Sequence, residues 1–232
     1  MKRVYREVTT RPVADRWGIA LDGRPMRTPG RNELIVPSAA LAEAIAAEWE
    51  AQQGDIRPAT MPLTRLAATA IDRTRAQREL VVAETANYAG TDLVCYRAEH
   101  PPALVARQEE TWQPLIDWAI GRYDSGLAVT SGIVPHPQQS ATLKAFAAAV
   151  AAQDDLRLTA LHTATAAYGS LVVALALLEG RLDAEAAFAA SQLDESFQIE
   201  AWGEDAEASA RRQALAADIA AAARFVHLLD AE

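Results

Sequence analysis

The sequence predicts an α+β fold that is mostly helical, with a small N-terminal antiparallel β-sheet or partial barrel followed by a larger helical domain with a central apolar helix. Three observations predict it. Before Pro37, apolar and small residues alternate between turn signals; after Pro37, the periodicity is helical; and residues 158–178 carry no charged side chain. We therefore expect a β-rich domain over residues 1–37 and a helical domain over residues 38–232.

The N-terminal part has the pattern of short antiparallel strands. Trp17, Ile19 and Leu21 alternate with small residues. The Asp22-Gly23 pair that follows is a strong hairpin signal, because glycine accepts a positive φ. Further strands are expected in "VYREVTTRPVA", "PMRT" and "ELIVP". Together these segments predict a small sheet.

Helical patterns run from Pro37 almost to the end of the chain. Ser38 is suited to cap a helix in which Leu41, Ile45 and Trp49 recur every four residues and form one apolar stripe. Pro114 lies inside a later helix and should kink or split it. The further helices are expected over about residues 63–72, 75–88, 102–123, 138–154, 158–178, 183–201 and 204–229.

Residues 158–178 also have the length of a membrane-spanning helix. Only their C-terminal part, "LVVALALL", is strongly apolar, and Arg157 and Glu179 flank the stretch without an aromatic belt or a basic cluster. A helix that is apolar on all sides can equally be the central helix of a globular domain. We expect that arrangement and no membrane insertion, with a membrane span as the alternative.

Charge and cysteine content narrow the range of functions. The formal net charge of −9 argues against a general nucleic-acid binder, which needs a basic surface. Cys95 is the only cysteine, so no disulfide framework can form, and its apolar neighbours predict a buried structural residue. The segment "MKRVYREVTT" lacks the apolar core of a signal peptide, so we expect a cytoplasmic protein.

Motifs for metal, nucleotide or acyl chemistry are absent from the sequence. It contains no HExxH, no phosphate-binding GxxxxGK[ST], no GxGxxG between a strand and a helix, and no GxSxG. The histidines are scattered over separate segments, at His100, His136, His162 and His227. We therefore expect no metal, no cofactor and no catalytic residue.

One acidic cluster remains, in "IEAWGEDAEASARR". Gly203 fits a break between two helices, and Glu204, Asp205 and Glu207 then fall in the first turn of the second helix, where carboxylates complement the helix dipole. A corner that carries Trp202 among these acids also has the composition of a protein contact site. Capping and contact are compatible interpretations, and both stay open here.

Two other functions are alternatives to a specific binding protein. A hydrolase could use Glu200, Glu204 and Asp205 as acid, base or metal ligands, which would require a cleft and a carboxylate with a strongly perturbed pKa. The chain could also be a helical scaffold for an unrelated partner. No self-complementary apolar stripe is evident, so we expect a monomer.

Six stretches, taken in order, resemble a known family: "WGIALDGRPMRTP", "PSAALAEAIAAEW", "MPLTRLAATAID", "YAGTDLVCYR", "GSLVVALAL" and "QIEAWGEDAEA". The family is the alpha-subunit-specific assembly chaperone of the F1 sector of ATP synthase, found in mitochondria and alphaproteobacteria. The resemblance extends from Trp17 to about Ala208. The alanine-rich composition and the lack of a presequence fit a bacterial member.

The resemblance implies a role without catalysis or cofactor. Such a protein binds free alpha subunit before it pairs with the beta subunit, and so prevents its aggregation. The resemblance ties Glu204 and Glu207, with Asp205 beside them, to function; with Trp202 they are the expected partner-binding residues. Trp49 matches a position whose disruption damages the family's function, and its place in the apolar stripe predicts that it acts through folding.

Overall fold

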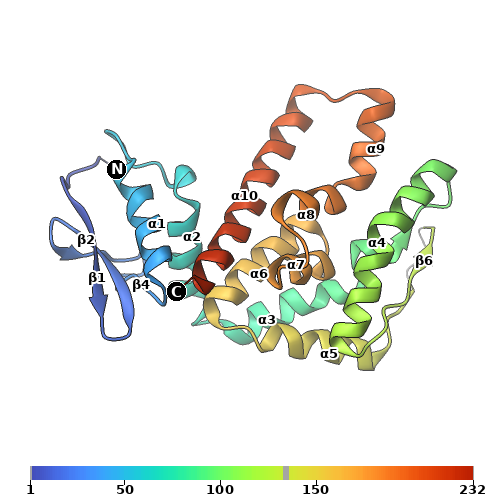
Figure 1. Cartoon of the computed structure of the whole chain (residues 1–232), viewed down its shortest axis with the longest axis horizontal. Helices are drawn as coiled ribbons and strands as arrows, with labels where there is room; N and C mark the ends of the chain where they lie inside the picture. The colour runs from blue at the N-terminus through green and yellow to red at the C-terminus, as the bar shows by residue number, and fades with distance from the viewer. Residues whose placement is uncertain (1, 133–135, 232) are drawn as a thin grey trace. The chain divides into compact units, whose positions relative to one another are not determined.

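A computed structural model describes residues 2–132 and 136–231 and shows the expected α+β, mostly helical fold (Figure 1). The chain divides into two compact units. The first comprises Met1–Arg78, Asp155–Ala160 and Ala221–Glu232, and the second comprises Glu79–Asp154 and Leu161–Ala220.

The first unit contains a four-stranded antiparallel sheet. Its strands are β1 (Val8–Val13), β2 (Arg16–Leu21), β3 (Arg24–Pro25) and β4 (Ile35–Val36). The central strand β2 pairs with each of the other three, and its register with β1 runs from Val8 opposite Leu21 to Val13 opposite Arg16. Asp22 and Gly23 both have positive φ, as the hairpin signal predicted.

Helices α1 and α2 of this unit follow the sheet in the chain. Helix α1 (Ala39–Glu50) is capped by Ser38, whose Oγ accepts a hydrogen bond from the Leu41 N–H at 3.2 Å. The helix packs on β1 and β2 and buries Leu41 and Ile45 (Figure 1). Helix α2 (Pro62–Thr69) follows and continues into a π-helical turn. The first 37 residues thus share a unit with α1 and α2, and a separate domain over residues 1–37 stays a prediction.

The second unit is helical apart from two short parallel strands, β5 (Tyr96–Arg97) and β6 (Thr130–Ser131). Its helices are α3 (Arg78–Asn87), α4 (Pro102–Tyr123), α5 (Ser140–Ala151), α7 (Leu171–Leu178), α8 (Ala184–Ser191) and α9 (Leu193–Trp202). Helices α6 (Asp155–Tyr168) and α10 (Ala206–Asp230) contribute residues to both units. All eight residues of α7 are buried, which makes it the central helix of this unit.

The single helix expected over residues 158–178 is wrong, because the stretch divides into α6 and α7. Gly169 adopts a φ of 65°, which residues with a Cβ rarely adopt, and Ser170 then caps α7 by accepting from the Val173 N–H at 3.0 Å. The apolar run is therefore too short to span a bilayer in one helix. In the part of the chain that the structure describes, no helix is long and apolar enough to cross a membrane.

The junction between α6 and α7 is held by a buried carboxylate on a distant loop. Asp92 accepts hydrogen bonds from the Ser170 hydroxyl at 2.5 Å and from the Val172 N–H at 3.0 Å. It also accepts from the Val94 N–H at 3.3 Å. Burial raises the pKa of this carboxyl from 3.8 to about 6, against the opposing effect of these hydrogen bonds.

Two other helix boundaries differ from expectation. Helix α4 continues through Pro114, so of the predicted kink or split the split does not occur. Trp112, two residues earlier, is fully buried and donates its indole N–H to the Ala190 carbonyl at 2.8 Å. Packing of this kind offsets the local cost of proline. Conversely, the helix expected over residues 183–201 divides at Gln192 into α8 and α9.

Candidate functional site

The predicted break between two helices is present and forms an exposed corner. Helix α9 ends at Trp202, and the N–H of Gly203 donates to the Ile199 carbonyl at 2.8 Å before the chain turns at a φ of 83°. Residues 201–207 are all exposed, and Trp202 is 81% exposed. We name Trp202, Gly203, Glu204, Asp205 and Glu207 the acidic corner.

The carboxylates of the acidic corner have different surroundings. Asp205 caps α10, since its Oδ1 accepts from the Ala208 N–H at 2.8 Å, and this part of the capping interpretation is confirmed. Glu207 lies in the first turn of α10 with its side chain 85% exposed and its nearest cation, Arg211, 3.8 Å away. An exposed pair at this spacing holds a side chain only weakly, so Glu207 is available to a partner.

Glu204 forms an ion pair with Arg212, a residue that no sequence pattern singled out as its partner. The Nε of Arg212 lies 3.3 Å from Glu204 Oε1, and both side chains are mostly buried. Arg212 also donates to Gln192 Oε1 at 3.3 Å and to Ser196 Oγ at 3.1 Å, and its guanidinium lies over the Phe188 ring. Arg212 therefore connects α10 to α8 and α9 and fixes the conformation of the acidic corner.

Glu200, one turn before the corner, has a structural partner. The two guanidinium nitrogens of Arg107 on α4 reach its two carboxylate oxygens at 2.8 Å and 2.7 Å, and the Arg107 guanidinium lies over the Phe197 ring. This hydrogen bonding lowers the pKa of Glu200. The pair joins α9 to α4 and keeps the carboxylate ionised.

These surroundings do not suit the hydrolase hypothesis. General acid catalysis needs a carboxyl whose pKa is raised in a cleft that excludes water. The acidic corner is exposed, the pKa of Glu200 is lowered, Glu204 is paired with arginine, and Asp205 is used as a helix cap. Among residues 2–132 and 136–231, no group of three or more His, Cys, Asp or Glu side chains is placed to hold a metal ion. The geometry instead suits contact with another macromolecule.

Trp49 lies in the first unit, on α1, and is half-buried. It packs against a cluster formed by Tyr5, Ile56 and Met61, with the Tyr5 and Trp49 rings 5.8 Å apart. The Tyr5 hydroxyl donates to the Trp49 carbonyl at 2.8 Å. The indole Nε1 is buried without an acceptor, so the ring contributes through its apolar area rather than through a hydrogen bond. This supports the expected role in folding.

Substitutions at Trp49 should separate these two contributions. We expect Trp49→Ala to lower the free energy of unfolding by about 2–3 kcal/mol, because it removes packing from the cluster. Trp49→Phe should cost less than about 1 kcal/mol, because it keeps an aromatic ring and removes an unpaired donor. Urea unfolding monitored by circular dichroism measures both values. Equal losses for the two variants would contradict a role based on packing.

Cys95 is buried, as expected, in the second unit. Desolvation, with a smaller effect of the nearby Asp92 carboxylate, raises the pKa of its thiol to about 12. The reactive thiolate is therefore scarce at neutral pH, and Cys95 is a structural residue. His162 on α6 lies with its Nδ1 3.0 Å from the Thr85 hydroxyl, as a satisfied core histidine would.

Comparison with known proteins shows the family to which this chain belongs. Residues 2–120 match the family model described as ATP12 chaperone protein. The crystal structure of Atp12 from Paracoccus denitrificans is 44% identical, with a TM-score of 0.93 over 98% of each chain. That of the Atu1473 protein of Agrobacterium tumefaciens is 39% identical, with a TM-score of 0.93 over 99% of this chain and 86% of the other.

A sequence relative agrees with the solved structures. "Protein atp12, mitochondrial" of Schizosaccharomyces pombe is 27% identical over 214 residues, which cover 87% of this chain and 74% of the relative. The fold is thus that of a chaperone family. The chain belongs to the ATP12 chaperone family. The resemblance found in the six ordered sequence stretches is confirmed at the level of the family.

Proposed function

We propose that this protein is an assembly chaperone that binds the unassembled alpha subunit of the ATP synthase F1 sector and releases it when it pairs with the beta subunit. It does so as a monomer in the cytoplasm and makes or breaks no covalent bond. The observation that carries the proposal is an 81% exposed tryptophan, Trp202, surrounded by carboxylates on a firmly held corner of a family chaperone.

The chemistry of the acidic corner suits temporary binding. An unassembled subunit exposes apolar surface that its partners later bury, and a chaperone that covers this surface lowers its free concentration by mass action. Release requires a contact that is only partly apolar. One aromatic anchor with charged neighbours provides area at its centre and displaceable polar contacts around it.

The corner is also pre-organised for binding. Arg212 joins α10 to α8 and α9, and Arg107 joins α9 to α4, so that Trp202 and Glu207 project from a framework with few degrees of freedom. A site ordered before binding loses less conformational entropy when its partner arrives. Glu204 and Asp205 then serve the contact mainly by positioning its other members.

A charge reversal at Glu207 tests the proposal with a matched control. Glu207 and Glu185 are both exposed glutamates in the first turn of a helix, α10 and α8 respectively, so both substitutions remove the same helix-dipole interaction. We expect Glu207→Lys to weaken binding of purified alpha subunit by at least about tenfold, and Glu185→Lys to leave it within about twofold. Calorimetric titration measures the affinity, and thermal unfolding checks the fold.

Two outcomes would overturn parts of the proposal, the first its contact site and the second its function. One is equal binding by the wild type and by both variants, which would move the contact away from the acidic corner. The other is no retention of the alpha subunit by the wild type in gentle salt, which would leave a scaffold for an unrelated partner. Glu204→Lys is less informative, because it places a cation against Arg212 and should also lower stability.

A further inference from the structure

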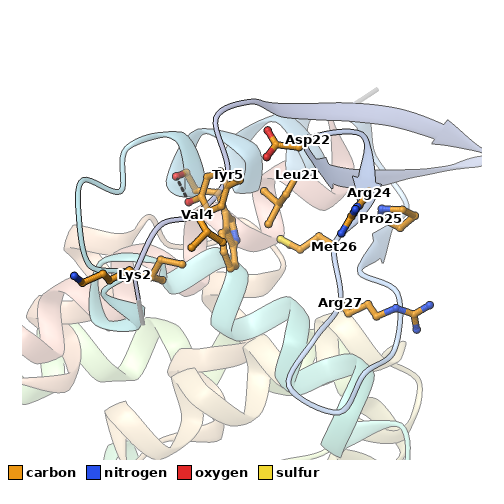
Figure 2. Close-up of a pocket in the computed structure, with 11 residues that line it drawn as sticks. Lys2, Val4, Tyr5, Leu21, Asp22, Arg24, Pro25, Met26 and Arg27 are labelled. Carbon is orange, nitrogen blue, oxygen red and sulfur yellow. Dashed lines mark hydrogen bonds between the residues drawn. The ribbon is translucent and has the colours of Figure 1, made fainter.

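The first unit contains a second concave surface, which is lined by residues of β3 and by Trp49 of α1. Two pockets, of about 650 and 310 Å³, share the lining residues Met26, Arg27, Trp49 and Ile56, so they adjoin. Volumes of this size are typical of ligand sites. We name the two pockets together the Trp49 groove, and Figure 2 shows the larger one.

The floor of the Trp49 groove is apolar. Tyr5 and Met26 are buried there, and Leu21 and Trp49 are partly buried. Val4, which also lines the larger pocket, is 88% exposed. An exposed apolar residue continuous with an apolar floor is a common feature of protein contact sites.

The rim of the groove is basic, although the whole chain has a net charge of −9. Lys2, Arg24 and Arg27 line the larger pocket, and none of them forms an ion pair with a carboxylate of the described residues. Figure 2 shows Lys2 and Arg27 at opposite ends of it, with Arg24 on the side of Arg27.

The one carboxylate that lines the larger pocket, Asp22, already has partners. Its Oδ1 accepts hydrogen bonds from the N–H groups of Arg6 and Glu7 at 2.9 and 3.0 Å, and these bonds lower its pKa. Asp22 is thus ionised, and the nearby charge of Arg24 also lowers its pKa, so this one carboxylate offsets part of the positive charge of the rim. The three cations of the rim therefore exceed its acids, which favours an occupant that brings carboxylates of its own.

We propose that the Trp49 groove is a second docking site of the chaperone, which takes an extended segment of the client polypeptide that carries apolar side chains flanked by carboxylates. That the segment belongs to the alpha subunit rests on the proposed function; the chemistry of the segment rests on the groove. Apolar side chains occupy the floor, and carboxylates pair with Lys2, Arg24 and Arg27. The acidic corner and the groove then bind different chemistry, an arrangement that strengthens capture through two linked contacts.

Charge variants of the rim test this proposal. Arg24 and Arg27 are exposed, so Arg24→Glu/Arg27→Glu should fold, and Arg24→Lys/Arg27→Lys keeps the charge as a control. We expect the glutamate pair to weaken binding of purified alpha subunit by at least about tenfold and the lysine pair to stay within about threefold. The loss should shrink as salt is raised from about 50 to 300 mM, because exposed charges are screened.

A second measurement keeps the groove testable without the alpha subunit. Immobilised wild-type protein is used to select from a phage-displayed library of random dodecapeptides, with the glutamate-pair variant as the counter-selection. We expect enriched peptides to combine Asp or Glu with large apolar residues and to lose binding in the glutamate pair. Peptides without an excess of carboxylates, or peptides that bind the variant equally well, would overturn the proposal.

The two experiments separate the two proposals. If wild-type protein binds the alpha subunit and the glutamate pair binds it equally well, the groove proposal is wrong and the proposed function stands. If wild-type protein fails to bind the alpha subunit but still binds acidic peptides that the glutamate pair does not bind, the proposed function is wrong. The groove is then still a site for acidic, apolar segments. Selective binding of a single-stranded oligonucleotide instead of acidic peptides would assign the groove to another class of ligand and overturn the proposal.

Discussion

Replacing Trp202 by alanine should weaken binding of the alpha subunit by about 30-fold or more and leave the stability of the protein almost unchanged. The indole is 81% exposed at the end of α9, so its removal takes no packing from the core. Central aromatic residues of an interface contribute about 2 kcal/mol or more to binding, which corresponds to that factor. The thermal midpoint should stay within about 2 °C of wild type.

The control for Trp202→Ala is another exposed apolar residue of the second unit. Leu80 on α3 is 50% exposed, and Leu80→Ala should leave the affinity within about twofold. Trp202→Phe should bind with intermediate affinity, because it keeps an aromatic ring of smaller area. Surface plasmon resonance with immobilised alpha subunit measures all three. Unchanged binding by Trp202→Ala would remove the tryptophan from the contact, and a large drop in thermal midpoint would show that it has a structural role.

The largest effect on stability is expected at Asp92, the fully buried carboxylate that holds the start of α7. Asp92→Ala leaves the Ser170 hydroxyl and the Val172 and Val94 N–H groups without their acceptor. Each buried donor left unpaired costs about 1–3 kcal/mol, so we expect the free energy of unfolding to fall by about 3 kcal/mol or more. Guanidinium unfolding measures this, and Thr85→Val, which removes one buried hydroxyl of the second unit, is a milder comparison.

Asp92 should also make stability depend on pH in an unusual direction. Burial raises its pKa from 3.8 to about 6, so the folded chain holds a proton that the unfolded chain has already lost between these pH values. The stability that comes from this proton is fully present below the unfolded pKa and is lost as the pH rises through the folded pKa. The whole effect is about 3 kcal/mol, of which about 1 kcal/mol should appear between pH 7 and pH 5.

The pH effect is measured as a difference from Asp92→Asn, which cannot ionise. The free energy of unfolding of the wild type, minus that of the variant, should increase by about 1 kcal/mol when the pH is lowered from 7 to 5. Other titrating groups affect both proteins alike and cancel. A constant difference would show that Asp92 has an ordinary pKa in the folded chain, and one that decreases on acidification would show that this pKa is lowered; either result would contradict the prediction.

In the acidic corner, exposure alone does not separate the residues that we propose contact a partner from those that support the corner. All of its carboxylates lie in exposed residues of one short segment, yet Glu204 is bound to Arg212 and Asp205 caps α10. Glu207 forms only an exposed ion pair with Arg211, and the Trp202 side chain is largely exposed, so neither supports the corner as Glu204 and Asp205 do. Charge reversals in this segment therefore differ in meaning: at Glu204 and Asp205 they change the support of the corner, and at Glu207 they change its surface.

Local signals were sufficient for several features. The hairpin at Asp22 and Gly23, the Ser38 cap, the change from strand to helix near Pro37 and the helix break at Gly203 follow from turn and capping preferences that depend on a few neighbouring residues. The family was also accessible, because six ordered stretches are a specific combination even where each is weak alone.

Local signals failed where a distant residue decides the conformation. Hydropathy favoured one helix over residues 158–178, but the conformation of Gly169 and the buried carboxylate of Asp92 divide it into α6 and α7. Proline preference favoured a split at Pro114, and packing around the buried Trp112 accompanies a continuous helix. In both cases a contact with another segment is involved: Asp92 with the start of α7, and the Ala190 carbonyl with Trp112. Periodicity within a segment contains no information about such contacts.

By itself, the sequence determined the fold class, the chaperone family and the position of the acidic corner, because periodicity, turn chemistry and ordered motifs are properties of neighbouring residues. Only the tertiary structure decided which acids are held and which are available, and it alone revealed the Trp49 groove. Arg107 and Glu200 are 93 residues apart in the chain, and the residues of the groove are spread from Lys2 to Ala68. Contacts over such separations arise from packing, which single-sequence patterns do not specify.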